Sequence, residues 1–212
     1  MMIPTQIMAI IQSVSVAPSS RHLRAPFADR FDGVTGTRLL WLAGIVMLGF
    51  GAAELPALAR MSSHGTGVLG FEFAGSTHRM HEILTRWGSA GHAAAQQHVF
   101  IDLGFILGYG LLLIGWCGRL AGRFERNGHS RAARVAALLA AGALIAAIAN
   151  ALQKIVLWLE LHGHIAQPLP ALAAVCGTIT FTLAISAALF AIVGMIAMRR
   201  PSAVRTSEGQ TQ

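Results

Sequence analysis

The sequence predicts an all-α polytopic membrane protein: an up-down bundle of four transmembrane helices with one external amphipathic helix. Three observations predict this fold class. First, 54% of the 212 residues are hydrophobic and only 12% are charged, with a mean hydropathy of +0.59, whereas a soluble domain has about 25% charged residues. Second, the apolar residues form four long segments. Third, the arginines gather in the short segments between and beyond them.

The four apolar segments define the predicted spans. A bilayer core about 30 Å thick needs roughly 20 apolar residues in helical form. Each segment reaches or approaches that length, and together they define a transmembrane domain over residues 38–200. The predicted spans cover about 39–58, 99–117, 136–159 and 172–198.

The placement of arginines predicts the orientation of the bundle. Three arginines lie in the connection between the first two spans: Arg60, Arg79 and Arg86. Twelve lie before the first span, between the second and third, or at and after the end of the fourth: Arg21, Arg24, Arg30, Arg38, Arg119, Arg123, Arg126, Arg131, Arg134, Arg199, Arg200 and Arg205. By the positive-inside rule, both termini lie in the cytoplasm and the spans cross the cell (plasma or inner) membrane. Residues 1–37 are then a cytoplasmic segment, and residues 201–212 a disordered cytoplasmic tail.

Small residues recur along the predicted spans. Gly104 and Gly108 form a GxxxG pair in the second span, and residues 136–151 of the third span are rich in alanine. Small side chains let membrane helices approach closely, so these faces suit helix packing. A general abundance of alanine and glycine would produce the same pattern.

The connection between the first two spans contains a pattern of its own, over residues 76–95. Apolar residues there follow the i, i+3, i+4, i+7 spacing of one helix face. They are Met80, Ile83, Leu84 and Trp87. This pattern predicts an interfacial helix, either a lid over the outer mouth of the bundle or, as we favour, a passive membrane anchor. Gly88 and Gly91 lie inside the range and interrupt it if either leaves the helical conformation.

Polar residues inside the spans indicate a candidate pocket. Asp102 in the second span, Lys154 in the third and Glu54 in the first lie at similar heights in the outer leaflet. Ionisable residues at membrane depth face the bundle interior and have partners, so we expect a polar cluster. Asn150 lies one turn below Lys154, and Tyr109 lies two turns below Asp102. The alternative is that Lys154 extends to the head groups and Glu54 is exposed.

Histidines are unevenly distributed. Seven of the nine lie on the predicted outer side: His64, His78, His81, His92, His98, His162 and His164. Gathered imidazoles can bind zinc or copper, but four convergent ligands are not evident. Haem needs histidines that face each other within the spans, and only His98 approaches a span. The sequence therefore predicts no metal site and no cofactor.

A pattern also runs from the first connection into the second span. It consists of Phe71-Glu72-Phe73-Ala74, then Ile83-Leu84 and Trp87, then Asp102 with Phe105 and Tyr109. This pattern resembles a group of uncharacterised bacterial four-span integral membrane proteins, in which a FELA…IL..W segment precedes an aspartate-bearing second span. The resemblance covers about residues 71–190 and implies topology but no activity. That group tends to have an acidic residue before the asparagine of the third span, where this chain has Ala149.

Three classes of function remain. We favour a non-enzymatic membrane module, a subunit or small-ligand sensor, with a polar pocket on its outer face. The alternatives are a small oligomeric transporter or proton-linked carrier that uses Asp102 and Lys154, and an outer-leaflet enzyme acting on lipid or quinone. Motifs such as GxSxG and HExxH are absent, so no catalytic residue is predicted.

The expected partners follow from the same observations. They are the lipid bilayer and either a second copy of the chain or a membrane partner subunit. The net charge of +7 does not indicate nucleic acid, because the arginines flank the apolar spans, where lipid head groups attract them.

Overall fold

The computed structural model describes residue 31 and residues 33–199. The predicted tail over 201–212, and all but the last residues of the predicted segment over 1–37, lie outside the described residues. Within the described part the fold is all-α, with no strand. The elements are α3 (Gly33–Ser63), α4 (Val68–Glu72), α5 (Thr77–Arg126), α6 (Ser130–Leu161) and α7 (Leu169–Arg199).

Four of these helices, α3, α5, α6 and α7, are long and apolar enough to cross a membrane. Each contains one predicted span and extends beyond it at both ends. The structure therefore confirms the predicted all-α four-helix bundle, and the chain has the architecture of a multi-pass membrane protein. The short α4 lies in the connection between α3 and α5.

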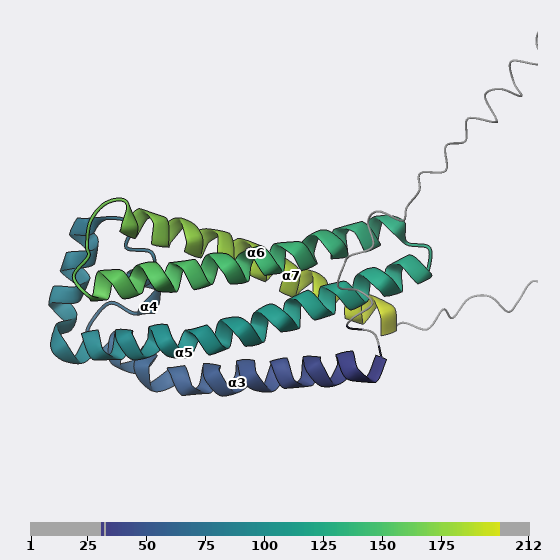
Figure 1. The fold of residues 1–212 in the computed structure, drawn as a ribbon, viewed down its shortest axis with the longest axis horizontal. Helices are drawn as coiled ribbons and strands as arrows, with labels where there is room; N and C mark the ends of the chain where they lie inside the picture. Colours follow the sequence, from purple (N-terminus) through teal and green to yellow (C-terminus); the bar gives the residue numbers. More distant parts are fainter. Residues whose placement is uncertain (1–30, 32, 200–212) are drawn as a thin grey trace, which may run out of the picture.

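The long helices run up and down and pack mainly on their neighbours in the chain (Figure 1). Helix α3 packs on α5, α5 on α6, and α6 on α7, while α5 also contacts α7. In the described part of the chain, α3 and α7 make at most marginal contact. The bundle is therefore a bent row of helices whose two outer members do not close against each other.

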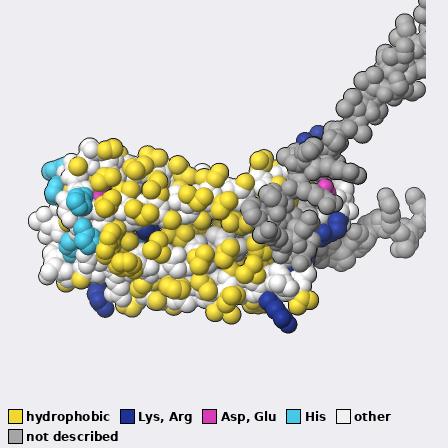
Figure 2. Space-filling model, in the orientation of Figure 1, with side chains coloured by type: hydrophobic (Ala, Val, Ile, Leu, Met, Phe, Trp, Pro, Cys, Tyr) yellow, Lys and Arg dark blue, Asp and Glu magenta, His cyan; other side chains and the backbone are white. Residues whose placement is uncertain are grey.

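The two ends of the bundle differ in composition. One end, which we name the histidine end, carries His64, His78, His81, His162 and His164, near the start of α5 and between α6 and α7. The other, the arginine end, carries Arg38, Arg119, Arg123, Arg126, Arg131 and Arg134. Between the two ends, hydrophobic side chains cover most of the visible surface (Figure 2). Trp41, Leu138 and Val193 are each more than 60% exposed, as expected where lipid rather than water surrounds the protein.

Helix α5 is divided at Gly88. This residue has φ 58° and ψ −161°, a non-helical conformation that only glycine adopts readily. The first segment ends at Trp87. Ser76 caps its start, where the Ser76 side chain accepts a hydrogen bond from the Arg79 backbone N–H. The predicted external helix over 76–95 is thus shorter than expected, because the residues after Gly88 already belong to the second long helix.

The apolar face of this first segment is buried in the protein. Met80, Ile83 and Trp87 are at most 1% exposed, and Leu84 packs against the same core. The indole N–H of Trp87 donates a 2.8 Å hydrogen bond to the Thr66 carbonyl. These residues are therefore core residues and not the interfacial anchor that the sequence predicts, because the connection between α3 and α5 folds back and covers them.

The small residues of the spans allow close helix contacts within the chain. A Cβ added at Gly108 would lie 2.5 Å from the Met47 backbone nitrogen, and one at Gly104 would lie 2.3 Å from the Phe50 ring. The GxxxG pair thus packs on α3. The alanines of α6 that are buried include Ala136, Ala140, Ala143 and Ala146.

Candidate functional site

The ammonium group of Lys154 lies at the centre of a buried charge cluster. The Lys154 side chain, on α6, is 2% exposed. Its Nζ donates to Asp102 Oδ2 at 2.7 Å and to Glu72 Oε1, and lies 3.3 Å from His98 Nε2. Helices α4, α5 and α6 therefore meet at this one cation. A buried ammonium is stable only with such partners, because it has lost its hydration.

Glu72 enters the cluster from the short helix α4. Its backbone carbonyl accepts a 3.3 Å hydrogen bond from Gln153 Nε2, which ties α4 to α6. Burial alone would raise the pKa of the Glu72 carboxyl, but Lys154 and His98 outweigh this effect and hold that pKa at about 2. Glu72 is therefore a fixed negative charge at neutral pH.

His98 connects Glu72 to Glu54. His98 Nε2 lies 3.3 Å from Glu72 Oε1, and His98 Nδ1 lies 3.9 Å from Glu54 Oε1. The second distance is too long for a hydrogen bond. Glu54 Oε1 and His98 Nδ1 are both buried and have no hydrogen-bond partner among the described residues. We name these five residues, Glu54, Glu72, His98, Asp102 and Lys154, the charge cluster.

A second polar pair lies beside the charge cluster. Asn150 Nδ2 donates a 3.2 Å hydrogen bond to the Tyr109 hydroxyl, and both residues are buried. The structure thus brings together all five pocket residues named from the sequence, and all five line one cavity: Glu54, Asp102, Tyr109, Asn150 and Lys154. Lys154 and Glu54 are buried, so the alternative in which they extend to the surface does not hold.

The cavity is a groove of about 610 Å³ between α3 and α7, with α5 as its floor. The charge cluster occupies its end nearest the histidine end of the bundle. From there the groove runs along α5 from His98 to Trp116, about 27 Å at a rise of about 1.5 Å per residue. Beyond the cluster its walls are mostly apolar and include Met47, Leu112, Phe181, Ala188, Ile192 and Met195.

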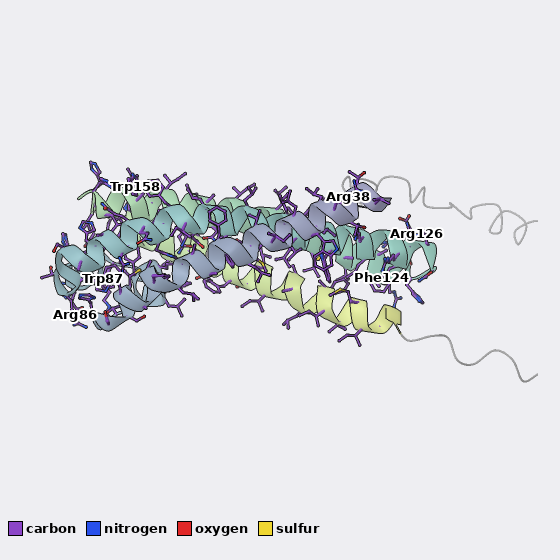
Figure 3. All side chains as sticks on the ribbon, turned by 90° about the horizontal axis from the view of Figure 1, so that it is seen from below. Arg38, Arg86, Trp87, Phe124, Arg126 and Trp158 are labelled. Carbon is purple, nitrogen blue, oxygen red and sulfur yellow. The ribbon has the colours of Figure 1, made fainter. Side chains whose placement is uncertain are left out.

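The groove exists because α3 and α7 do not pack on each other. Figure 3 shows these two helices diverging towards the arginine end. Helix α5 packs on α3 and also contacts α7, so it lies between them and leaves the space above it unfilled. The long side of the groove therefore faces the surface that the hydrocarbon of a membrane would cover.

Two members of the charge cluster, Glu72 and His98, are not among the pocket residues named from the sequence. His98 precedes Asp102 by four residues and so shares its helix face, which was the available signal. Glu72 lies in an otherwise apolar stretch, VLGFEFA, and a lone acid there is itself a sign of burial with a partner. Its partner could not be inferred, because Lys154 is 82 residues away in the chain.

The histidines of the connecting loops do not converge. His78, His81, His162 and His164 are exposed. A ring nitrogen of His92 lies 2.7 Å from the Leu161 carbonyl, and ring nitrogens of His64 and His162 also bond backbone carbonyls. In the described part of the chain, none of these histidines belongs to a group of ligand atoms close enough to share a metal ion.

A different set of side chains has the spacing of metal ligands. Ligand atoms of Glu72, His98 and Asp102 lie within 4.8 Å of one another. However, Lys154 Nζ lies within 3.3 Å of all three, so an ammonium group already occupies the position that a cation would take. We therefore interpret these residues as a charge cluster with an internal cation, not as a metal centre.

Comparison of the chain with protein families, with curated proteins and with solved structures finds no match. The chemistry of the charge cluster and the shape of the groove beside it are therefore the features that bear on function. Together they form a site with one charged end and one long apolar end.

Proposed function

We propose that this protein is a membrane module that binds a small amphipathic molecule in the groove between α3 and α7. One observation carries the proposal: a single cavity joins the buried charge cluster to a long apolar channel. A molecule with a polar head and a hydrocarbon chain matches both parts at once. The polar head lies at the charge cluster, and the chain lies along α7.

The size and lining of the groove support this proposal. Ligand sites are usually concave, mostly apolar, and about 300–1,000 Å³ in volume, with a few polar groups that fix orientation. The groove of about 610 Å³ falls within this range. Its charged groups are confined to one end, so they orient a ligand along the groove and not across it.

The position of the groove supports entry from the lipid phase. Its long opening lies between two helices that each expose large apolar side chains, such as Leu48 on α3 and Leu189 on α7. An amphipathic molecule already dissolved in the bilayer can enter sideways without crossing water. We further propose that the histidine end faces outward from the cell and the arginine end faces the cytoplasm, by the positive-inside rule.

A variant that fills the groove tests the proposal. Ala188 lines the groove on α7, so Ala188→Phe places a ring in the apolar channel, whereas Ala53→Phe places the same ring on an exposed position of α3 outside it. Each protein is extracted in mild detergent, and bound small molecules are identified by native mass spectrometry. We expect wild type and Ala53→Phe to retain the same amphipathic molecule and Ala188→Phe to lose it. Equal retention by all three would contradict the proposal.

A second candidate function is a proton-linked carrier. Glu54, His98, Lys154 and Asp102 form a series of proton-exchanging groups across α3, α5 and α6, with successive distances of 3.9, 3.3 and 2.7 Å. In sealed vesicles with an internal pH dye, a carrier would move protons when its substrate is added, and Asp102→Asn would abolish that flux. A binding module would show no proton flux in either protein, and the two candidates are thereby separated.

A further inference from the structure

The charges of the cluster do not balance. Three carboxyl groups, from Glu54, Glu72 and Asp102, face one permanent cation, Lys154. Lys154 forms ion pairs with Glu72 and Asp102. Glu54 lies beside the Asp102 carboxyl group, with which it can share a hydrogen bond only if one of the two is protonated, and the nearest basic group in the cluster is the His98 ring at 3.9 Å. Glu54 is therefore the carboxyl group that lacks a cation.

A buried carboxyl group in this position is either protonated or paired with a cation from outside, because an unpaired buried charge is very costly. Glu54 is 7% exposed and His98 is 3% exposed. The unpartnered atoms, Glu54 Oε1 and His98 Nδ1, both belong to residues that line the groove. These two atoms are 3.9 Å apart and enclosed, so a ligand nitrogen reaches Glu54 when its side chain turns towards the groove that it lines.

The lining of the groove beside these atoms indicates which chemical group is attached to such a nitrogen. Phe105 and Tyr109 line it next to the cluster, with ring centroids 5.5 Å apart, and aromatic faces attract ammonium groups. Beyond them the lining is mostly apolar as far as Met195, and Trp116 lies at that far end with an indole N–H that has no hydrogen-bond partner among the described residues. A small hydrated cation would leave this channel empty, whereas a hydrocarbon chain attached to the nitrogen fills it.

We propose that the occupant of the groove is a lipophilic amine, with its ammonium group beside Glu54 at the charge cluster and its hydrocarbon chain between α3 and α7. This inference rests on the proposed function and names the class of its ligand. A fatty acid is excluded by repulsion, because its carboxylate would meet three carboxyl groups. An alcohol can donate to Glu54 but brings no positive charge to offset the three carboxyl groups.

Three probes with the same chain and different heads test the inference: dodecylamine, dodecanol and dodecanoate. The full chain is placed in nanodiscs of zwitterionic phosphatidylcholine, so that the lipid surface does not itself attract the amine. Binding is measured as the rise in unfolding temperature with probe concentration. We expect dodecylamine to bind at least tenfold more tightly than dodecanol, and dodecanoate not to bind.

Two matched variants test whether Glu54 is the carboxyl group that recognises the amine. Glu54→Gln should lower the affinity for dodecylamine at least tenfold and leave the affinity for dodecanol unchanged. Glu160→Gln is the control, because Glu160 is also a buried carboxyl group without hydrogen-bond partners but does not line the groove. It should keep the preference for the amine. If Glu54→Gln does not fold, the comparison of probes on wild type decides alone.

The outcomes separate this inference from the proposed function. If dodecylamine and dodecanol bind equally and Ala188→Phe blocks both, the groove is an amphiphile site but the inference of an amine is overturned. If Glu160→Gln removes the preference as strongly as Glu54→Gln, the inference is overturned as well. If no probe binds in a way that Ala188→Phe blocks, both the inference and the proposed function fail.

Discussion

The Lys154 side chain contacts acceptors from two other helices, and its burial makes those contacts obligatory. Glu72 and Asp102 approach the same Nζ, so this one positive charge offsets two negative ones. The His98 ring adds a neighbour whose Nε2 can accept from Lys154 or donate to Glu72, depending on its tautomer. At the scale of single residues, the cluster is thus interdependent: each member lowers the cost of burying the next.

Replacement of Lys154 tests this interdependence. Lys154→Met keeps the length of the side chain but leaves Glu72 and Asp102 as unpaired buried carboxylates. Removal of one partner of a buried ion pair costs about 3–5 kcal/mol, so we expect a large fall in unfolding temperature in detergent. The double variant Lys154→Met/Asp102→Asn should lose less than the sum of the single losses. A wild-type unfolding temperature for Lys154→Met would show that the ion pairs do not contribute.

The hydrogen bond of Trp87 gives a second prediction for a single residue. Trp87→Phe keeps a ring in the core but leaves the Thr66 carbonyl without its donor. We expect a loss of about 1–3 kcal/mol in the free energy of unfolding, measured by denaturant titration in detergent. Trp41→Phe is the control, because Trp41 is 72% exposed and its replacement should change stability by less than about 0.5 kcal/mol. Equal effects in the two variants would contradict a core role for Trp87.

At the scale of elements, the connection between α3 and α5 is part of the bundle. Helix α4 brings Glu72 to the charge cluster, and the first segment of α5 places Trp87 against Phe71, with ring centroids 5.1 Å apart. The break at Gly88 lets that segment change direction before the long part of α5 begins. The geometry of the site therefore depends on a segment outside the four long apolar stretches.

Substitution at Gly88 tests the importance of the break in α5. A Cβ at this position would meet nothing within 4 Å, so Gly88→Ala adds no clash and acts only through the backbone conformation. Backbone conformations that are essentially restricted to glycine cost other residues about 1–3 kcal/mol, and we expect a loss of stability of that size.

Gly49→Ala is the control for the Gly88 substitution. Its Cβ also meets nothing within 4 Å, but Gly49 is in a regular part of α3. Here alanine should be neutral or stabilising by up to about 1 kcal/mol. Equal effects of the two substitutions on the unfolding temperature would show that the break in α5 does not require glycine.

At the scale of the whole molecule, the helices form a row that is left open between its first and last members. The open side is the groove, and its apolar walls would be covered by lipid or by a ligand. The two ends of the bundle are chemically different, one rich in histidine and the other in arginine. This asymmetry is the basis for the proposed orientation in the membrane.

Thiol labelling checks the orientation. His164→Cys and Ser130→Cys place a cysteine at exposed positions on opposite ends of the bundle, while the native Cys117 and Cys176 are buried. In intact cells, a membrane-impermeant thiol reagent should label His164→Cys and not Ser130→Cys. After the membrane is opened, both should react. Labelling of Ser130→Cys in intact cells would reverse the proposed orientation.

Much of the fold could be predicted from the sequence, because lipid imposes a simple length requirement. Long apolar segments form helices there, since every backbone N–H and C=O must be bonded internally. Part of the site followed from the same reasoning: Asp102 and Lys154 lie at compatible heights, and a buried charge needs a partner. Helical register then placed Asn150 and Tyr109 on the same faces.

The sequence by itself determined the number of long helices, their up-down order and the heights of their charged residues, because all three depend on composition and helical rise along one segment. Only the tertiary structure decided that Glu72 and His98 complete the cluster, that Trp87 is buried, and that α3 and α7 stay apart. These features depend on contacts between segments distant in the chain. Such contacts are set by how the connection after α3 folds back, which no local periodicity specifies.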